Sequence, residues 1–243
     1  VPAPPASLDG LLAEAARSMP GECAGLIVEG VKRCADYQDL AYARRYLDRL
    51  APIRAADARA GMQGRLARET ARHLAVRLSF EDVIRVAQAK TSAERLARVR
   101  SEVRAKEHEP LEITEHFKPG IEEIAAILPP GPARWLIAWA ERTGRLGKVY
   151  FSMHVRTTTV WGFARLRFLA SLRWWRPRTF RFVEEQAEID RWLASIRAAA
   201  PLGVELAREI AESARLIKGY GDTFRRGLAN YRRIADEVIA PAL

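Results

Sequence analysis

Few residue pairs in this sequence have the types and spacing that catalysis or metal binding needs. Glu69 and His73 are four residues apart, so their side chains would lie one turn apart on a helix. One such pair supplies only two of the four ligands that a zinc-type site usually needs. We therefore expect a polar contact on a helix face, with a metal site as the alternative.

A run of carboxylates forms the second group of candidates. Glu184, Glu185 and Glu188 fall within about one helical turn. Paired carboxylates act as general acid and base when burial separates their pKa values. Arg181 precedes Glu184 by three residues, which is the spacing of an ordinary helix ion pair. We interpret the run as surface or interface charge, and acid–base catalysis by Glu184 or Glu188 is the weaker alternative.

The two cysteines, Cys23 and Cys34, are too few for a disulfide scaffold or for a site of four thiolates. We expect two small buried thiols rather than a redox pair. The sequence also lacks a Gly-rich phosphate loop ending in Gly-Lys-Ser/Thr, a GxSxG elbow, an HExxH pair and a CxxC pair.

The most distinctive local string is a glycine-rich turn between two predicted helices. It comprises Lys218, Gly219, Tyr220, Gly221, Asp222 and Thr223. Backbone N–H groups beside a lysine at the start of a helix are a candidate anion-binding site. In the competing interpretation the glycines supply positive φ angles and Asp222 caps the next helix. We favour the second interpretation, because a phosphate loop normally follows a strand.

The positive charge of the sequence is concentrated in one segment. The chain has 40 Lys and Arg against 30 Asp and Glu, a net charge of +10, and residues 142–183 carry ten bases and no acid. A localised excess indicates a face that can meet an acidic partner. The candidate basic face comprises Arg156, Arg165, Arg167, Arg173, Arg176, Arg178 and Arg181.

Tryptophans accompany the arginines in this segment. Trp174 and Trp175 beside arginines are the mixture that single-stranded nucleic acid sites use for stacking and phosphate neutralisation. The same segment has a wide apolar side that includes Phe163, Leu166 and Leu169, and tryptophans there are more often core or interface anchors. We favour the anchor interpretation and keep nucleic acid as the alternative.

Helical periodicity dominates the elements that would position these residues. With 243 residues, 49% of them hydrophobic, the chain is long enough to bury a core without disulfides. Pro52 is expected to stop the second helix, and Ser79 and Thr91 to cap two later ones. The predicted helices span 8–19, 23–50, 62–78, two capped segments over 79–103, 119–128, 132–142, 160–174, 179–199, 201–218 and about 222–239.

Two runs break this pattern. Residues 111–116 and 149–156 alternate apolar and polar side chains or are rich in β-branched residues, which predicts a small antiparallel ribbon. We therefore expect a mainly α, multi-helix bundle-like fold with a two-stranded β element. Residues 1–7, which are rich in proline, are expected to be an interdomain linker. Residues 8–243 are expected to form a single helical domain. The alternative is that this domain has two lobes, which would meet near residues 109–118. The sequence contains no apolar stretch of about 18 residues, so it predicts no membrane-spanning helix.

Several strings in a fixed order resemble a known family. They are VKR (31–33), DYQDLAY (36–42), YLDRL (46–50), SFEDVIRVA (79–87), KT (90–91), ERLARVR (94–100), FVEEQ (182–186), RWL (191–193) and KGYGDT (218–223). Over about residues 20–235 the chain resembles the uncharacterised C-terminal domain of indolepyruvate ferredoxin oxidoreductase-type proteins, in the 2-oxoacid:acceptor oxidoreductase superfamily.

The resemblance implies a parent enzyme that converts an aryl 2-oxoacid to an acyl-CoA with thiamine diphosphate and Mg²⁺, and passes electrons through iron–sulfur clusters to ferredoxin. This chain has no Gly-Asp-Gly thiamine motif and no cysteine cluster, so the resemblance implies no catalytic residue, metal or cofactor here. The implied partners are the catalytic domain of the same protein, its partner subunit and, through the complex, ferredoxin, all in the cytoplasm.

These observations predict a non-catalytic domain that packs on or recruits the catalytic domain or subunit. The alternative is a module whose basic face binds a phosphate-rich ligand, either CoA or nucleic acid.

Overall fold

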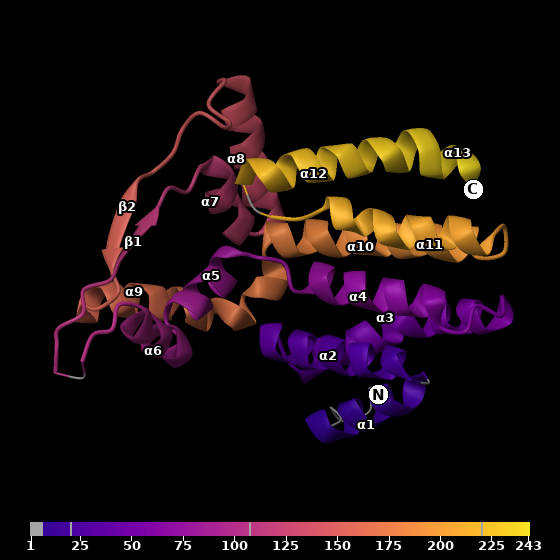
Figure 1. Ribbon diagram of the computed structural model, residues 1–243. Helices are drawn as coiled ribbons and strands as arrows, with labels where there is room; N and C mark the ends of the chain where they lie inside the picture. Colours follow the sequence, from indigo (N-terminus) through magenta and orange to yellow (C-terminus); the bar gives the residue numbers. More distant parts are fainter. Residues whose placement is uncertain (1–6, 20, 107, 220) are drawn as a thin grey trace. The chain divides into compact units, whose positions relative to one another are not determined.

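A computed structural model describes residues 7–19, 21–106, 108–219 and 221–243 (Figure 1). The chain divides into two compact units. Unit 1 contains the chain up to Phe80 and again from Glu185 onward, whereas unit 2 is Glu81–Glu184. Residues 109–118 lie within unit 2. The described chain is mainly α-helical with one two-stranded antiparallel sheet, as the sequence predicts.

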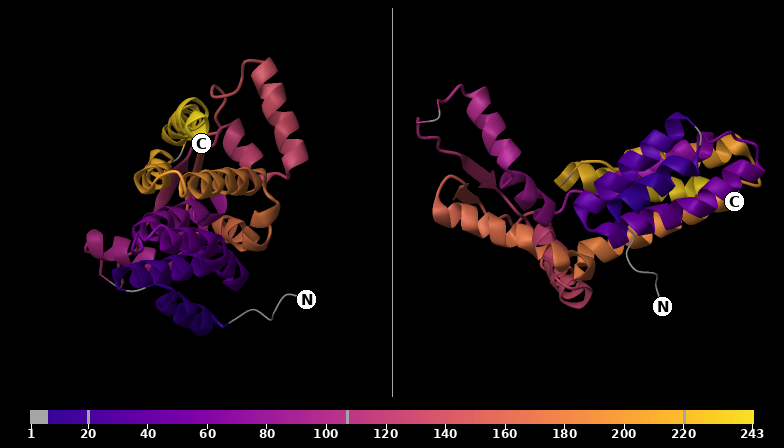
Figure 2. Two further views of the ribbon diagram at one scale, coloured as in Figure 1. Left: turned by 90° about the vertical axis from the view of Figure 1, so that its right-hand side faces the viewer. Right: turned by 90° about the horizontal axis from the view of Figure 1, so that it is seen from below.

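Unit 1 is a stack of helices, and both Figure 1 and Figure 2 show its order: α12, then α10 and α11, then α3 and α4, then α2 and α1. Helix α2 packs on α1, α3 and α4, and α4 also packs on α11. The helices of this unit are α1 (Leu8–Ser18), α2 (Glu22–Tyr37), α3 (Leu40–Arg59), α4 (Arg65–Leu78), α11 (Val204–Ser213), α12 (Gly221–Ile234) and α13 (Ala240–Ala242), with a π-helical turn at Ala235–Ile239. Helix α10 (Phe180–Ala199) begins in unit 2 and belongs to unit 1 from Glu185 onward.

The core of unit 1 contains tyrosines whose hydroxyl groups find partners on α4. The Tyr42 hydroxyl donates to the Leu78 carbonyl at 2.9 Å, and the Tyr46 hydroxyl donates to the Ala71 carbonyl at 3.2 Å. Gly30 on α2 leaves the space that the Tyr46 ring occupies, because a Cβ at that position would collide with the ring. A buried phenol needs such a partner, so these bonds fix α3 against α4.

The prediction of one helix over 23–50 that stops at Pro52 is wrong. Helix α2 ends at Tyr37 and α3 begins at Leu40, because Asp39 caps α3 by accepting a hydrogen bond from the Tyr42 amide at 2.7 Å. Pro52 lies inside α3. A proline there removes one helical hydrogen bond, and the burial of Leu50 and Ile53 on either side stabilises the helix across it.

The predicted caps at Ser79 and Thr91 are also wrong, by one to three residues. Ser79 ends α4, and its hydroxyl donates back to the Ala75 carbonyl at 2.7 Å. Helix α5 (Val83–Lys90) is capped by Asp82, and α6 (Ala93–Glu102) is capped by Ser92. In each helix the cap side chain accepts from the amide three residues on, whereas the hydroxyl groups of Ser79 and Thr91 donate back to carbonyls of the preceding helix.

Unit 2 is built around the ribbon. Strand β1 (Thr114–Phe117) pairs antiparallel with β2 (Met153–Arg156), and Gly120 bridges Tyr150 beyond them. The ribbon is confirmed, with shorter strands than predicted. Helix α7 (Ile121–Ile127) packs on α8 (Pro130–Arg142), and α9 (Val160–Ser171) packs on α5. Short 3₁₀ turns follow α9 at Leu172–Trp174 and Arg176–Arg178.

Within the described ranges no helix is both long and apolar enough to cross a membrane.

Candidate functional site

Helix α9 of unit 2 buries only a narrow stripe. Thr159 caps it by accepting a hydrogen bond from the Gly162 amide at 3.2 Å. Gly162, Leu166 and Ala170 are the buried residues, spaced four apart so that they lie along one side of the helix. A Cβ on Gly162 would collide with the Arg156 carbonyl, so glycine permits the close approach of α9 to the end of β2. The rest of the helix is free to face solvent.

The exposed side of α9 combines aromatic and basic residues. Val160, Trp161 and Phe168 are 83%, 79% and 66% exposed. Arg165 and Arg167 are exposed beside them and form no ion pair with any residue that the structure describes. We call this surface the α9 face; it consists of Val160, Trp161, Ala164, Arg165, Arg167, Phe168 and Ser171. Large apolar side chains beside unpaired arginines mark a surface for interaction.

The α9 face extends towards Trp174. This indole is 63% exposed, and the guanidinium carbon of Arg178 lies 5.7 Å from its ring centre. Trp175 behaves differently, because its Nε1 donates to the Ile127 carbonyl at 3.1 Å and ties the segment to the end of α7. One tryptophan of the pair is therefore exposed and the other anchors the chain.

The structure divides the seven arginines of the candidate basic face. Arg176 is fully buried, with its Nε 2.6 Å from Asp82 Oδ2, so it stabilises unit 2 and does not belong to a surface. Arg156 is exposed and pairs with Glu112 at 3.2 Å. Arg173 and Arg181 are half-buried. The structure therefore leaves Arg165, Arg167 and Arg178 as the most exposed bases near the aromatic side chains.

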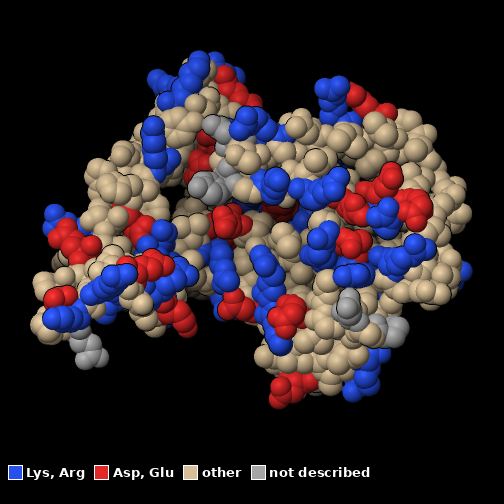
Figure 3. Space-filling model, viewed as in Figure 1, with Lys and Arg blue, Asp and Glu red and all other residues tan. Residues whose placement is uncertain are grey.

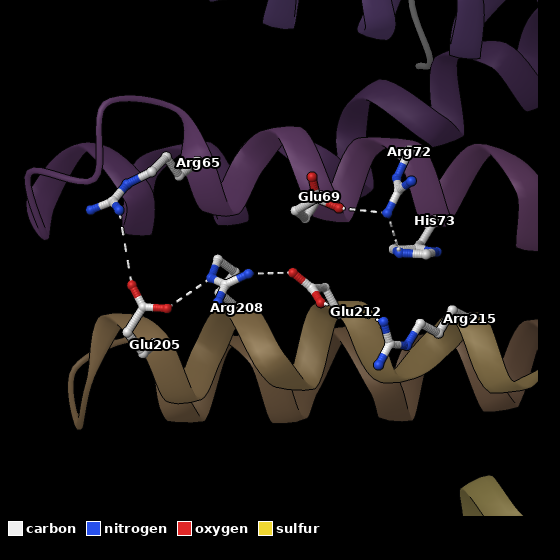
Figure 4. A network of polar contacts seen from close by, with 8 residues as sticks. All are labelled: Arg65, Glu69, Arg72, His73, Glu205, Arg208, Glu212 and Arg215. Carbon is white, nitrogen blue, oxygen red and sulfur yellow. Dashed lines mark hydrogen bonds and ion pairs between the residues drawn. The ribbon is translucent and has the colours of Figure 1, made fainter.

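Glu69 and His73 lie in a network of polar contacts between α4 and α11 in unit 1 (Figure 4). Glu69 Oε2 is 2.8 Å from Arg72 Nη2, which is 3.2 Å from His73 Nε2. Burial, with a further contribution from Arg72, lowers the pKa of His73. The network consists of Arg65, Glu69, Arg72, His73, Glu205, Arg208, Glu212 and Arg215.

The arginines and carboxylates of this network pair with one another, with four arginines to three glutamates. Arg208 contacts Glu205 at 2.8 Å and also pairs with Glu212, while Arg65 Nη1 lies 3.9 Å from Glu205. Over α4 and α11, blue and red side chains accordingly alternate in Figure 3. Among the described residues, no three His, Cys, Asp or Glu side chains gather as metal ligands. Glu69 and His73 each contact Arg72.

The three carboxylates of the run Glu184, Glu185 and Glu188 lie in different surroundings. Glu184 pairs with Arg134 at 3.3 Å. Glu185 and Glu188 are buried, and Glu188 is held by Arg191 at 2.6 Å and by Arg232, whose Nε is 2.7 Å away. The expectation of surface charge is therefore wrong for Glu185 and Glu188, because the packing of unit 1 buries both side chains, and Glu188 is held there by ion pairs.

Sequence reasoning missed Arg77, which lies 4% exposed near Glu185 and Glu188. Its guanidinium carbon lies 5.6 Å from the ring centres of both Trp192 and Tyr231. Burial lowers the pKa of Arg77, whereas the two carboxylates act in the opposite direction. The available signal was an arginine three residues after Leu74, on the apolar stripe of its helix.

The cysteines are both free and buried. Burial raises the pKa of Cys34 to about 12 and also raises that of Cys23. Both sulfurs are therefore protonated near neutral pH, which suits small core side chains.

The glycine-rich turn is only partly described. Lys218 is exposed, and Gly219 and Gly221 have the positive φ values, 77° and 55°, that a helix–helix turn requires. Tyr220 and the side chain of Asp222 lie outside the described residues, so the predicted cap by Asp222 and anion binding at this turn stay predictions.

These features define a mainly helical protein of two units, with an aromatic–arginine helix face on unit 2. The chain belongs to the family of unknown function DUF6537, whose model matches residues 23–237. No curated protein and no solved structure matches it.

Proposed function

We propose that this chain is a non-catalytic contact domain that binds the catalytic domain or subunit of a 2-oxoacid oxidoreductase through the α9 face. The observation that carries the contact function is the exposure of Trp161 and Phe168 beside two arginines that form no ion pair with any described residue. The sequence resemblance supports the class of partner. Thiamine diphosphate, Mg²⁺, the iron–sulfur clusters and CoA then belong to the partner, in the cytoplasm.

The composition of the α9 face favours a protein partner with an acidic surface. Tryptophan and arginine are enriched among the residues that dominate binding energy at interfaces. Burying the side chains of Trp161 and Phe168 removes apolar area from water, which contributes about 25 cal/mol per Å². Arg165 and Arg167 favour carboxylates on the partner, because neither is paired with an acid in the described part of this chain.

Photo-crosslinking in the cells that make the protein tests this proposal. A photoreactive amino acid replaces Phe168 in the native polypeptide, and Arg98 on α6, whose side chain is 68% exposed, is the matched control position. We expect an adduct from position 168 that contains peptides of a thiamine-diphosphate-binding polypeptide. Equal adduct yields at the two positions, or an adduct with an unrelated protein, would contradict the proposal.

A phosphate-rich ligand is the second candidate, and the contact of Arg178 with the exposed Trp174 ring favours it. An indole and a guanidinium side by side can stack on a base and bind a phosphate. The purified chain is titrated with CoA and with a single-stranded oligonucleotide at increasing salt. For the oligonucleotide, this candidate requires affinity that falls steeply with salt and weakens when Trp174 is replaced by Ala. The contact proposal predicts no measurable binding of either ligand.

A further inference from the structure

Unit 2 contains an apolar pocket that neither the sequence analysis nor the contact proposal uses. Its volume is about 390 Å³, within the range of small-molecule sites. The walls come from α7, α8 and the segment that joins α8 to β2. The lining residues are Ile121, Ile124, Leu136, Trp139, Arg145, Val149 and Phe151.

Backbone hydrogen bonds fix the segments that form these walls. The Arg145 and Leu146 amides donate to the Ala140 carbonyl at 2.8 and 3.2 Å, which turns the chain back at the end of α8. The Phe151 amide donates to the Pro119 carbonyl at 2.8 Å and places the next segment beside the start of α7. A pocket built from hydrogen-bonded backbone loses little conformational entropy when it is filled.

Among the described residues that line the pocket, Arg145 is the only charged one. Its guanidinium carbon lies 5.0 Å from the centre of the Trp139 ring. The guanidinium makes no ion pair with any residue in the described part of the chain. The contact with the indole places the guanidinium beside the apolar pocket, where its N–H groups can donate to a ligand.

We propose that this pocket binds an apolar monocarboxylate. The hydrocarbon part lies against Ile124, Leu136 and Phe151, and the carboxylate accepts hydrogen bonds from Arg145. An arginine side chain can donate two parallel N–H···O bonds to one carboxylate, so Arg145 suits a ligand with a carboxylate head. The site concerns a different surface from the α9 face and does not depend on the contact function.

The size of the pocket favours a small molecule over an anchoring side chain of a partner protein. A cavity of about 390 Å³ is larger than any single side chain, so an inserted residue would leave part of the apolar wall unfilled. Phe151 is 49% exposed at the pocket, and a ligand that covers its ring removes that apolar area from water.

Methyl NMR of the full chain, labelled at isoleucine δ1 carbons, provides the test, with octanoate as the probe. We expect octanoate to shift the Ile121 and Ile124 methyl signals and to leave Ile27, in the core of unit 1, unchanged. The matched probes 1-octanol and octyltrimethylammonium have the same chain with a neutral or a positive head. Both should bind at least about tenfold more weakly, because neither forms the charge-assisted bonds to Arg145.

Two variants distinguish the contribution of the apolar walls to binding from that of the charge on Arg145. Arg145→Gln should weaken octanoate about tenfold and change 1-octanol less than about threefold. Leu136→Trp should fill the pocket and abolish binding of both. Arg142→Gln, an exposed arginine at the end of α8 that does not line the pocket, is the control and should bind as the original chain does. Ile124→Phe replaces Leu136→Trp if far-UV circular dichroism shows that the latter is unfolded.

Three results would overturn the proposal. The first is octanoate binding that survives filling of the pocket. The second is 1-octanol binding as tightly as octanoate, and the third is no shift of the Ile121 and Ile124 signals at millimolar octanoate.

Discussion

Helix α11 carries one arginine and α9 carries two, and the surroundings of these arginines differ. On α11, Arg208 lies between Glu205 and Glu212 and contacts both. On α9, Arg165 and Arg167 have aromatic neighbours and no ion pair among the described residues. Helix α11 therefore pairs its arginine with carboxylates of its own chain, whereas α9 presents its arginines together with apolar area.

The difference indicates what each unit is for. An arginine that already pairs with carboxylates of its own chain gains little binding energy from a partner protein. An arginine beside an exposed indole gains when an acidic, apolar partner covers both. Net charge alone does not make this distinction, because both units have more bases than acids.

The largest loss of stability is expected when a buried arginine that forms an ion pair is replaced. Arg176→Met leaves Asp82 without its buried partner and should lower the free energy of unfolding by about 3–5 kcal/mol. Arg165→Met, on the α9 face, should change it by less than about 0.5 kcal/mol. Urea unfolding followed by tryptophan fluorescence measures both, because five of the six tryptophans belong to unit 2. Similar losses in the two variants would show that the basic segment is not divided as described.

A buried carboxylate tests the internal pairing of unit 1. Asp57 is 1% exposed, and its two oxygens accept from the Gly64 and Ala67 amides at 2.7 and 2.9 Å. Asp57→Ala leaves both amides unsatisfied and should cost about 2–3 kcal/mol in urea unfolding followed by circular dichroism. Asp48→Ala, on the same helix with a 63% exposed side chain, should cost less than about 1 kcal/mol. Equal costs would contradict a structural role for Asp57.

His73 gives the α4–α11 network a pH dependence. Burial lowers its pKa, so the folded state binds a proton less readily than the unfolded state. Its contribution to stability is present above the unfolded pKa of about 6.5 and is lost as pH falls below that value. Arg72, Arg215, Glu69 and Glu212 are the charged groups that act on it.

Comparing urea midpoints at pH values of about 7.5 and 5.5 measures this dependence. We expect a larger drop for the original chain than for His73→Gln, and an equal drop would assign the pH dependence to other groups.

The smallest effect on stability is expected at the α9 face itself. Trp161→Ser and Phe168→Ser remove exposed side chains and should change the free energy of unfolding by less than about 0.5 kcal/mol. Leu166→Ala, on the buried stripe of the same helix, should cost about 2–5 kcal/mol. Large losses in both serine variants would mean that the aromatic side chains stabilise the fold rather than wait for a partner.

The pattern of neighbouring residues along the chain predicted the helical class and the two-stranded ribbon correctly. It failed where a contact distant in sequence decides the outcome. Pro52 looks like a helix stop in its own window, yet the helix continues through it between two buried residues. Arg77 looks like one more surface base, yet Trp192 lies against it from 115 positions further along the chain.

By itself the sequence determined the helical periodicity and the separation of basic from acidic residues, because both are properties of neighbours along the chain. Only the tertiary structure decided that Arg176 is buried, that Arg165 and Arg167 are exposed, and that Arg145 lies at an apolar pocket. The physical reason is that burial and pairing depend on which helices pack together, and one arginine is chemically identical to another until that packing is known.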